Sequence, residues 1–128
     1  MLIQALQTAR PAQITDTHTR KLAVVYVRSS VDDGRSVSAQ RDLAELARRW
    51  GWPKARILVI DCDLGLPGAP ASNRSGFLHL MALTTAGEVG VAFVLDMSRL
   101  SRRPDRVAHS LHVAQRKGTL ICANGIVR

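Results

Sequence analysis

The sequence predicts one α/β domain, a doubly wound and mainly parallel sheet of about four strands with helices on both faces. Short apolar runs rich in β-branched residues alternate with amphipathic segments along the chain, which is typical of parallel sheets. The 128 residues can bury one sizeable core but leave little room for a second. Short right-handed crossovers then favour the doubly wound arrangement.

The sheet is expected to begin after residue 20. Residues 1–20 mix Gln, Thr, Pro and charged residues, with Leu2, Ile3 and Leu6 spaced as one helical turn. We expect these residues to form a loosely attached arm before a domain that spans residues 21–128. Residues 22–27 are apolar and β-branched, which predicts a first strand buried on both faces.

A helix and a second strand follow the turn at residues 32–35. The helix is indicated by apolar residues at i, i+3, i+4 and i+7 spacing, namely Leu43, Leu46, Ala47 and Trp50. Ser36 or Ser38 is the expected cap. Gly51 and Pro53 end this helix, and residues 57–60 form the second strand. Tyr26, Trp50 and Trp52 are candidates for the core.

Two more helix and strand pairs complete the pattern after an irregular segment at 62–73, which contains Gly65, Pro67, Gly68 and Pro70. A helix is predicted from Ser75 to Ala86, with Phe77, Leu80, Met81 and Thr84 on one face and Gly87 as its stop. Residues 89–95 form strand three. The last helix starts at Pro104, with Val107, Leu111 and Ala114 on one side and Gly118 at its end. Residues 119–122 form strand four.

The charge of the chain indicates a polyanionic partner. The formal net charge is +8 and the sequence pI is near 11.0. Lys21, Lys54 and Lys117 are the only lysines, so arginine supplies nearly all of the positive charge and suits bidentate phosphate contacts. A solvated basic surface is the alternative.

The two cysteines indicate neither a zinc site nor a disulfide framework. Cys62 and Cys122 lack CxxC spacing and clustered histidines, so a reducing cytoplasm is the expected location. No stretch approaches the roughly 20 apolar residues that a membrane span needs, and no secretory signal is evident.

Polar residues gather at the predicted carboxyl ends of three strands, in segments 28–30, 61–63 and 96–103. The third contains three arginines, and Arg74 is positioned to join them. Attack on a phosphodiester builds negative charge on its oxygens, which fixed arginines stabilise in the transition state. A serine such as Ser30 can act as the nucleophile and form a covalent phosphoryl intermediate.

Other interpretations of these residues stay open on the chemistry alone. Serines and arginines at strand ends often cap helices. Asp61, Asp63 and Asp96 are the oxygen ligands that magnesium prefers. The segment around Gly65 and Gly68 matches neither a P-loop nor a GxGxxG pattern, so a nucleotide site there is weakly indicated. The scattered histidines, His18, His79, His109 and His112, receive no functional assignment.

Four motifs in order resemble the catalytic domain of serine recombinases, the resolvase/invertase family, and in particular the large serine recombinases. They are Tyr26-Val27-Arg28-Ser29-Ser30, Ser36-Val37-Ser38-Ala39-Gln40, Arg74-Ser75-Gly76-Phe77 and Ser98-Arg99-Leu100-Ser101-Arg102. The similarity runs from about Ile14 to Val127.

The resemblance implies that Ser30 attacks a DNA phosphodiester and forms a 5′-phosphoserine linkage. It assigns Arg28, Arg99 and Arg102 to catalysis and Arg74, Gln40 and Arg103 to phosphate binding. It implies no metal or nucleotide cofactor, because the covalent bond conserves the phosphodiester energy. Under it, the aspartates order loops and orient arginines rather than bind metal. DNA is the expected partner, with dimers and tetramers typical of the family.

Two departures from the family qualify this expectation. Pro67 stands where relatives usually have serine. Relatives also continue beyond the point matched by Arg128, with the rest of the catalytic domain, an oligomerisation helix and DNA-binding domains, so we expect an incomplete catalytic domain. The alternatives are an inactive remnant of a mobile element and a passive basic DNA-binding module, whose affinity would fall steeply with salt.

Overall fold

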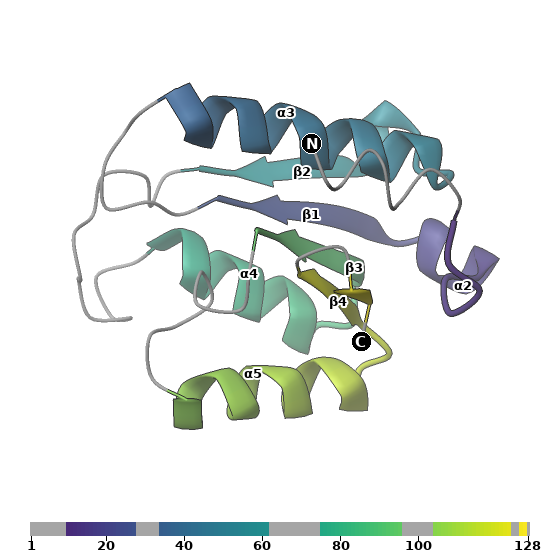
Figure 1. Cartoon of the computed structure of the whole chain (residues 1–128). Helices are drawn as coiled ribbons and strands as arrows, with labels where there is room; N and C mark the ends of the chain where they lie inside the picture. Colours follow the sequence, from purple (N-terminus) through teal and green to yellow (C-terminus); the bar gives the residue numbers. More distant parts are fainter. Residues whose placement is uncertain (1–9, 28–33, 62–74, 96–103, 124–125, 128) are drawn as a thin grey trace.

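The computed structural model describes residues 10–27, 34–61, 75–95, 104–123 and 126–127. They form a five-stranded sheet in the order β2-β1-β3-β4-β5 (Figure 1). The strands are β1 (Leu22–Tyr26), β2 (Ile57–Ile60), β3 (Val89–Val94), β4 (Leu120–Ala123) and β5 (Ile126–Val127). The helices are α2 (Asp16–Thr19), α3 (Gly34–Arg49), α4 (Ser75–Thr85) and α5 (Pro104–Arg116), with a 3-10 turn, η1, at Lys54–Arg56.

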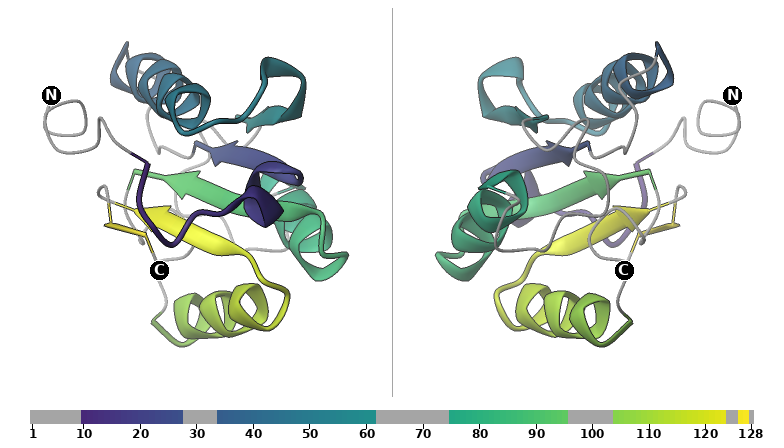
Figure 2. Two further views of the ribbon diagram at one scale, coloured as in Figure 1. Left: turned by 90° about the vertical axis from the view of Figure 1, so that its right-hand side faces the viewer. Right: turned by 90° about the vertical axis from the view of Figure 1, so that its left-hand side faces the viewer.

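The first four strands are parallel, and helices cover both faces of the sheet. α3 lies on one face, and α4 and α5 lie on the other (Figures 1 and 2). This arrangement confirms the predicted doubly wound fold. β5 pairs antiparallel with β4 and is an addition to the four predicted strands. Its two residues are too few to show a period in the sequence.

The core beneath α3 is built around aromatic side chains. Trp50 and Trp52 are buried and lie against Phe93 of β3, with ring centroids 5.6 Å and 6.0 Å from it. Leu43, Leu46 and Ala47 of α3 complete this layer. The predicted apolar face of the helix and the core placement of both tryptophans are therefore confirmed.

The core on the opposite face combines two aromatic rings with aliphatic side chains. Tyr26, Phe77, Leu80 and Ala114 are buried there, while Met81 is partly buried beside them. A small apolar void of about 10 Å³ lies between α4, α5 and the sheet. The predicted face of α4 is thus confirmed, as is the position of Tyr26 in the core.

The predicted C-terminal ends of α4 and α5 are confirmed, whereas the predicted N-terminal cap of α3 is not. α4 and α5 are followed by Gly87 and Gly118, whose φ angles of +76° and +74° favour glycine. α3 begins at Gly34, so the expected cap at Ser36 or Ser38 is wrong, because both serines lie inside the helix.

Residues 10–21 are held closely against the sheet rather than loosely attached. Ile14 is only 2% exposed and belongs to the core beneath α3. Gly90 occupies an irregularity in β3, where Leu22 pairs with Val89 but Ala23 pairs with Val91. A Cβ atom at Gly90 would lie 2.2 Å from the carbonyl oxygen of His18, so only glycine lets this segment come so close.

Candidate active site

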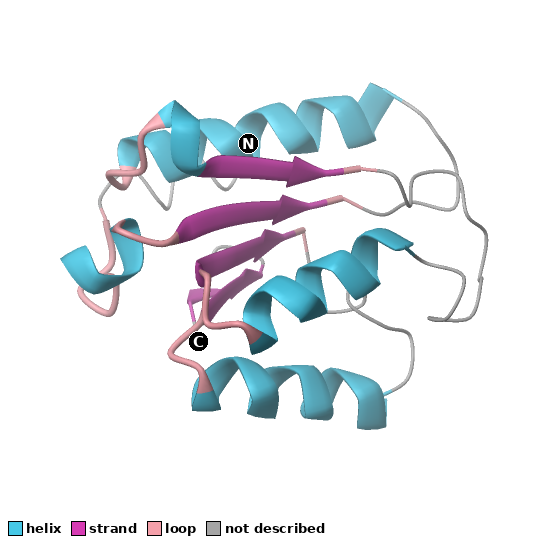
Figure 3. Ribbon diagram, turned by 180° about the vertical axis from the view of Figure 1, so that it is seen from behind, coloured by secondary structure: helices cyan, strands magenta, loops and turns pink. Residues whose placement is uncertain are grey.

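The sheet reverses its winding direction at β1, which lies between β2 and β3. In open α/β sheets such a switch point is where ligands bind, outside the carboxyl ends of the strands. Val25 pairs with Phe93, so β1 and β3 end side by side. The arrowheads of the parallel strands point to this common edge in Figure 3, which we call the carboxyl edge.

The chain segments with the predicted reactive residues leave from this edge. Segment 28–33 follows β1, segment 62–74 precedes α4, and segment 96–103 follows β3. These segments lie outside the described residues, and they contain Arg28, Ser30, Cys62, Asp63, Pro67, Arg74, Asp96, Arg99, Arg102 and Arg103. The sheet topology places the described residue that precedes each segment at the carboxyl edge.

Two of the four motifs touch through their described residues. The ring of Tyr26, from the first motif, lies 6.3 Å from that of Phe77, from the third, in an edge-on arrangement with an interplanar angle of 62°. Both rings are buried. In the sequence, Arg28 follows Tyr26 by two residues and Arg74 precedes Phe77 by three, so this contact joins the described ends of the two motifs at the same part of the edge.

The end of β2 is tied to the same place. The Val27 amide donates a hydrogen bond of 3.0 Å to the Ile60 carbonyl oxygen, which extends the pairing of β1 and β2 past the last strand residue. Asp61 follows and is exposed. Gln40 lies within α3, and its side chain is outside the described part of the structure.

Three helices begin at the carboxyl edge, because each helix returns antiparallel to the strand before it. Their first residues are Gly34, Ser75 and Pro104. Helix N-termini carry a partial positive charge and unpaired amide groups, which favour anions. The backbone therefore makes this edge electropositive before any arginine is counted, as a consequence of the alternation of strands and helices along the chain.

The histidines that the structure describes divide into two kinds. His79, His109 and His112 are exposed. His18 is partly buried, and its Nδ1 atom accepts a 3.0 Å hydrogen bond from the Thr15 amide at the start of α2. Burial, followed by the charges of Lys21 and Arg10, lowers the pKa of His18 below its ordinary value. His18 therefore has a structural function far from the carboxyl edge.

Neither a cluster of metal ligands nor a membrane-spanning helix is found among the described residues. Among them, no group of three or more His, Cys, Asp or Glu side chains is placed to hold a metal ion. None of the described helices is long and apolar enough to cross a membrane.

Comparison with known proteins assigns the fold to a family. The family described as "Resolvase, N terminal domain" matches residues 23–125. The chain belongs to this resolvase family. The expected resemblance to the serine recombinase catalytic domain is thereby confirmed.

A relative at the sequence level is the uncharacterized protein y4bA/y4pH of Sinorhizobium fredii (strain NBRC 101917 / NGR234). It is 38% identical over 109 residues, which are 81% of this chain and 16% of that protein. The resolvase domain described here therefore corresponds to about a sixth of the length of this relative.

Two solved structures share the fold. The N-terminal catalytic domain of TP901-1 integrase has a TM-score of 0.66 at 21% identity, covering 84% of this chain and 82% of that one. The C-terminal catalytic domain of ISC1926 TnpA, an IS607-like serine recombinase, has a TM-score of 0.63 at 22% identity, covering 80% and 69%. At these identities the likeness concerns the fold.

Proposed function

We propose that this resolvase domain is the catalytic domain of a site-specific DNA recombinase and that Ser30 is its nucleophile. The contact between Tyr26 and Phe77 carries the proposal, because it joins two sequence-distant motifs at the switch point of the sheet. The membership of the chain in the resolvase family supports the same function.

The proposed reaction is a transesterification without net loss of a phosphodiester bond. The Ser30 hydroxyl gives up its proton as its Oγ atom attacks phosphorus and forms a 5′-phosphoserine bond, while the bond to the 3′ oxygen breaks and that oxygen takes up a proton. The reverse attack by a 3′-hydroxyl on the phosphoserine rejoins the strand. Arg28, Arg99 and Arg102 stabilise the charge that develops on the phosphate oxygens.

The backbone of the carboxyl edge assists this chemistry. Arg74, Gln40 and Arg103 hold the DNA phosphates, and the N-termini of α3, α4 and α5 add a field that favours the anionic transition state. We propose duplex DNA as the substrate and dimers or tetramers as the working assembly. No metal ion or nucleotide takes part in this scheme.

The test is a covalent trap with a nicked DNA duplex whose cleaved strand is labelled at its 3′ end, because the 5′-phosphoserine bond joins the protein to the fragment that carries this end. Wild-type protein should form an adduct that survives a denaturing gel, and Ser30→Ala should form none. Thr85→Ala is the matched control, because Thr85 is an exposed hydroxyl at the other end of α4. An adduct that persists in Ser30→Ala would contradict the assignment of the nucleophile.

The same experiment separates the proposal from its alternatives. Wild-type protein that is folded and binds DNA but forms no adduct, either by itself or in the fused form described next, would indicate a passive binder or an inactive remnant. Fusion of the chain to an oligomerisation helix then distinguishes a missing assembly from a defective site, because only the former recovers the adduct.

A further inference from the structure

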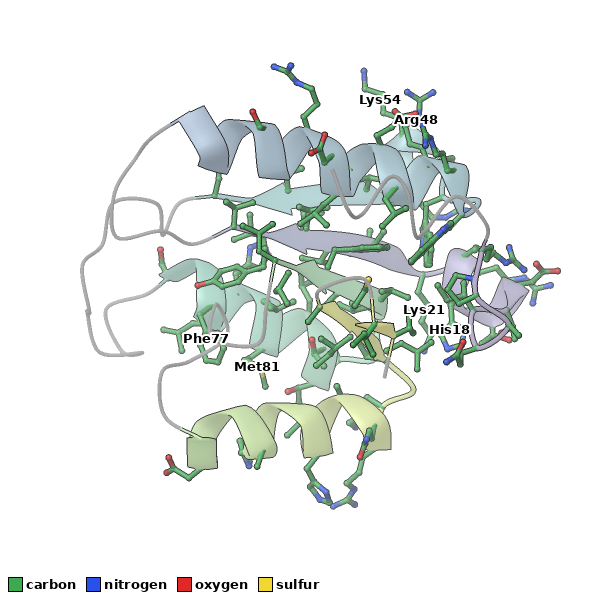
Figure 4. The ribbon with its side chains drawn as sticks, in the orientation of Figure 1. His18, Lys21, Arg48, Lys54, Phe77 and Met81 are labelled. Carbon is green, nitrogen blue, oxygen red and sulfur yellow. The ribbon has the colours of Figure 1, made fainter. Side chains whose placement is uncertain are left out.

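The end of the sheet opposite the carboxyl edge carries a second set of cations. We call it the amino edge, because the parallel strands begin there. An open groove of about 480 Å³ lies at this edge, lined by Arg20, Lys21, Leu22, Arg56, Gly87 and Glu88. Figure 4 shows Lys21, Arg48 and Lys54 at this same end of the molecule.

The three cations of the groove come from segments that precede adjacent strands. Arg20 and Lys21 lead into β1, and Arg56 leads into β2. The Arg56 Nε atom donates a 3.0 Å hydrogen bond to the Thr19 carbonyl oxygen, which orients the guanidinium and leaves its two Nη groups outside that bond. Within the described part of the chain, the ion pairs are Arg10–Asp16 and Arg49–Glu45, and neither involves the groove cations.

Main-chain and side-chain hydrogen bonds hold the walls of the groove in place. The Trp52 Nε1 atom donates to the Lys21 carbonyl oxygen at 3.1 Å. The Leu22 amide donates to the Glu88 carbonyl oxygen at 2.9 Å. A ligand that binds here therefore meets a backbone that is already ordered, which lowers the entropy lost on binding.

The surroundings of the groove are electropositive. The charges of Lys21 and Arg10 contribute to the lowered pKa of His18, after the larger effect of burial. Arg48, Arg49 and Arg116 also lie at this edge, in the last turns of α3 and α5. Cations at helix C-termini interact favourably with the helix dipole whether or not a ligand binds, so the proposal below does not rest on these arginines.

We propose that Arg20, Lys21 and Arg56 form a second DNA-binding surface, which holds the phosphate backbone of a duplex segment other than the one cleaved. A strand of five residues spans about 17 Å, so the groove lies far from the ends of the strands where the proposed reaction occurs. Two arginines and a lysine in one groove suit phosphate oxygens. The inference takes from the proposed function only that DNA is the polyanion.

Glu88 provides an internal test of this proposal. It is the one acidic residue that lines the groove, and it is exposed. Its carboxylate repels a phosphate that binds beside Lys21. Glu88→Gln should therefore strengthen DNA binding, whereas Arg20→Gln and Lys21→Gln should weaken it.

The experiment measures binding of the full chain to a fluorescent duplex of arbitrary sequence by anisotropy, as salt rises from about 50 to 200 mM. The magnitude of the slope of log K against log salt should fall by about 1 for Arg20→Gln and again for Lys21→Gln. Arg41→Gln, an exposed arginine in the middle of α3, is the matched control and should keep the slope. Asp42→Asn, within α3 and outside the groove, is the control for Glu88→Gln.

Several results would overturn the proposal. Equal losses in Arg20→Gln and Arg41→Gln would mean that only net charge matters. Loss of all binding in Arg28→Gln/Arg99→Gln, with no effect of Arg20→Gln, would place DNA at the carboxyl edge alone. Binding to vesicles of anionic lipid in preference to DNA would assign the groove to a membrane. Adduct formation by Ser30 is scored separately, so the two proposals fail independently.

Discussion

The carboxyl and amino edges of the sheet are built from the same strands and helices, yet they differ in their helix termini and in their contacts. Three helices begin at the carboxyl edge, and the segments with the motif residues leave from it. The amino edge receives the helix C-termini, and residues 10–21 pack closely against it beside the open groove. The carboxyl edge thus has the helix N-termini and the motif segments that suit catalysis on an anion, while the amino edge combines the cations of the groove with long-range contacts that stabilise the fold.

The contacts at the amino edge join parts of the chain that are far apart in sequence. An Arg10 Nη1 atom donates to the Trp50 carbonyl oxygen at 3.3 Å, and the Thr119 hydroxyl donates to the Val89 carbonyl oxygen at 2.7 Å. The comparison therefore predicts that variants of the buried contacts at the amino edge change stability, while variants of the proposed catalytic residues at the carboxyl edge change activity and leave stability unaltered.

The largest expected effect is on activity at the carboxyl edge. Ser30→Ala should abolish the covalent adduct, because no other hydroxyl takes its place in the proposed reaction. The free energy of unfolding should stay within about 0.5 kcal/mol of wild type. Parallel gels and urea titrations check the two halves of this prediction. A marked loss of stability would show that Ser30 also supports the fold.

The next effect is on stability at the amino edge. Gly90→Ala should destabilise the protein by about 3 kcal/mol, since the new Cβ would lie 2.2 Å from the His18 carbonyl oxygen and α2 would have to move. Urea unfolding measures the loss. Ala82→Ser, an exposed substitution within α4, is the control for a small change of side-chain volume. An unchanged midpoint for Gly90→Ala would contradict the close approach of α2 to β3.

A smaller loss is expected at the start of β4. Thr119→Val should cost about 1 to 2 kcal/mol, because it removes the buried hydroxyl that donates to the Val89 carbonyl oxygen. Thr85→Val, which changes an exposed threonine in the same way, is the matched control. Similar losses in the two variants, measured by thermal unfolding, would argue against a specific contribution of the Thr119 hydrogen bond.

The smallest effect is a pH dependence at α2. The pKa of His18 is lowered in the folded state, so the unfolded chain takes up the proton first as pH falls below the ordinary value of 6.5. Stability is therefore fully present above that pH and is lost as pH falls toward the folded pKa. The protonated ring also loses the acceptor that the Thr15 amide uses. Urea titrations from alkaline to mildly acidic pH measure the decline.

A substitution that keeps the capping contact at α2 but cannot take up a proton distinguishes the effect of His18 protonation from that of losing the contact. His18→Gln supplies a side-chain oxygen at the third helical position, where glutamine serves in capping boxes, and has no proton to gain. It should retain stability at alkaline pH and flatten the decline at acidic pH. His79→Gln, on the exposed side of α4, should behave as the parent chain. An unaltered decline in His18→Gln would assign the pH dependence to other groups.

By itself, the sequence determined the parallel sheet, the faces of α3 and α4 and the stops at Gly87 and Gly118, because periodicity and glycine conformation act over a few neighbouring residues. It also placed the motif segments at strand ends. Only the tertiary structure decided that Ile14 enters the core, that Gly90 admits α2, and that Tyr26 meets Phe77. These contacts join residues that are distant in sequence, so no local sequence pattern predicts them. They form only when the assembled sheet brings these residues together.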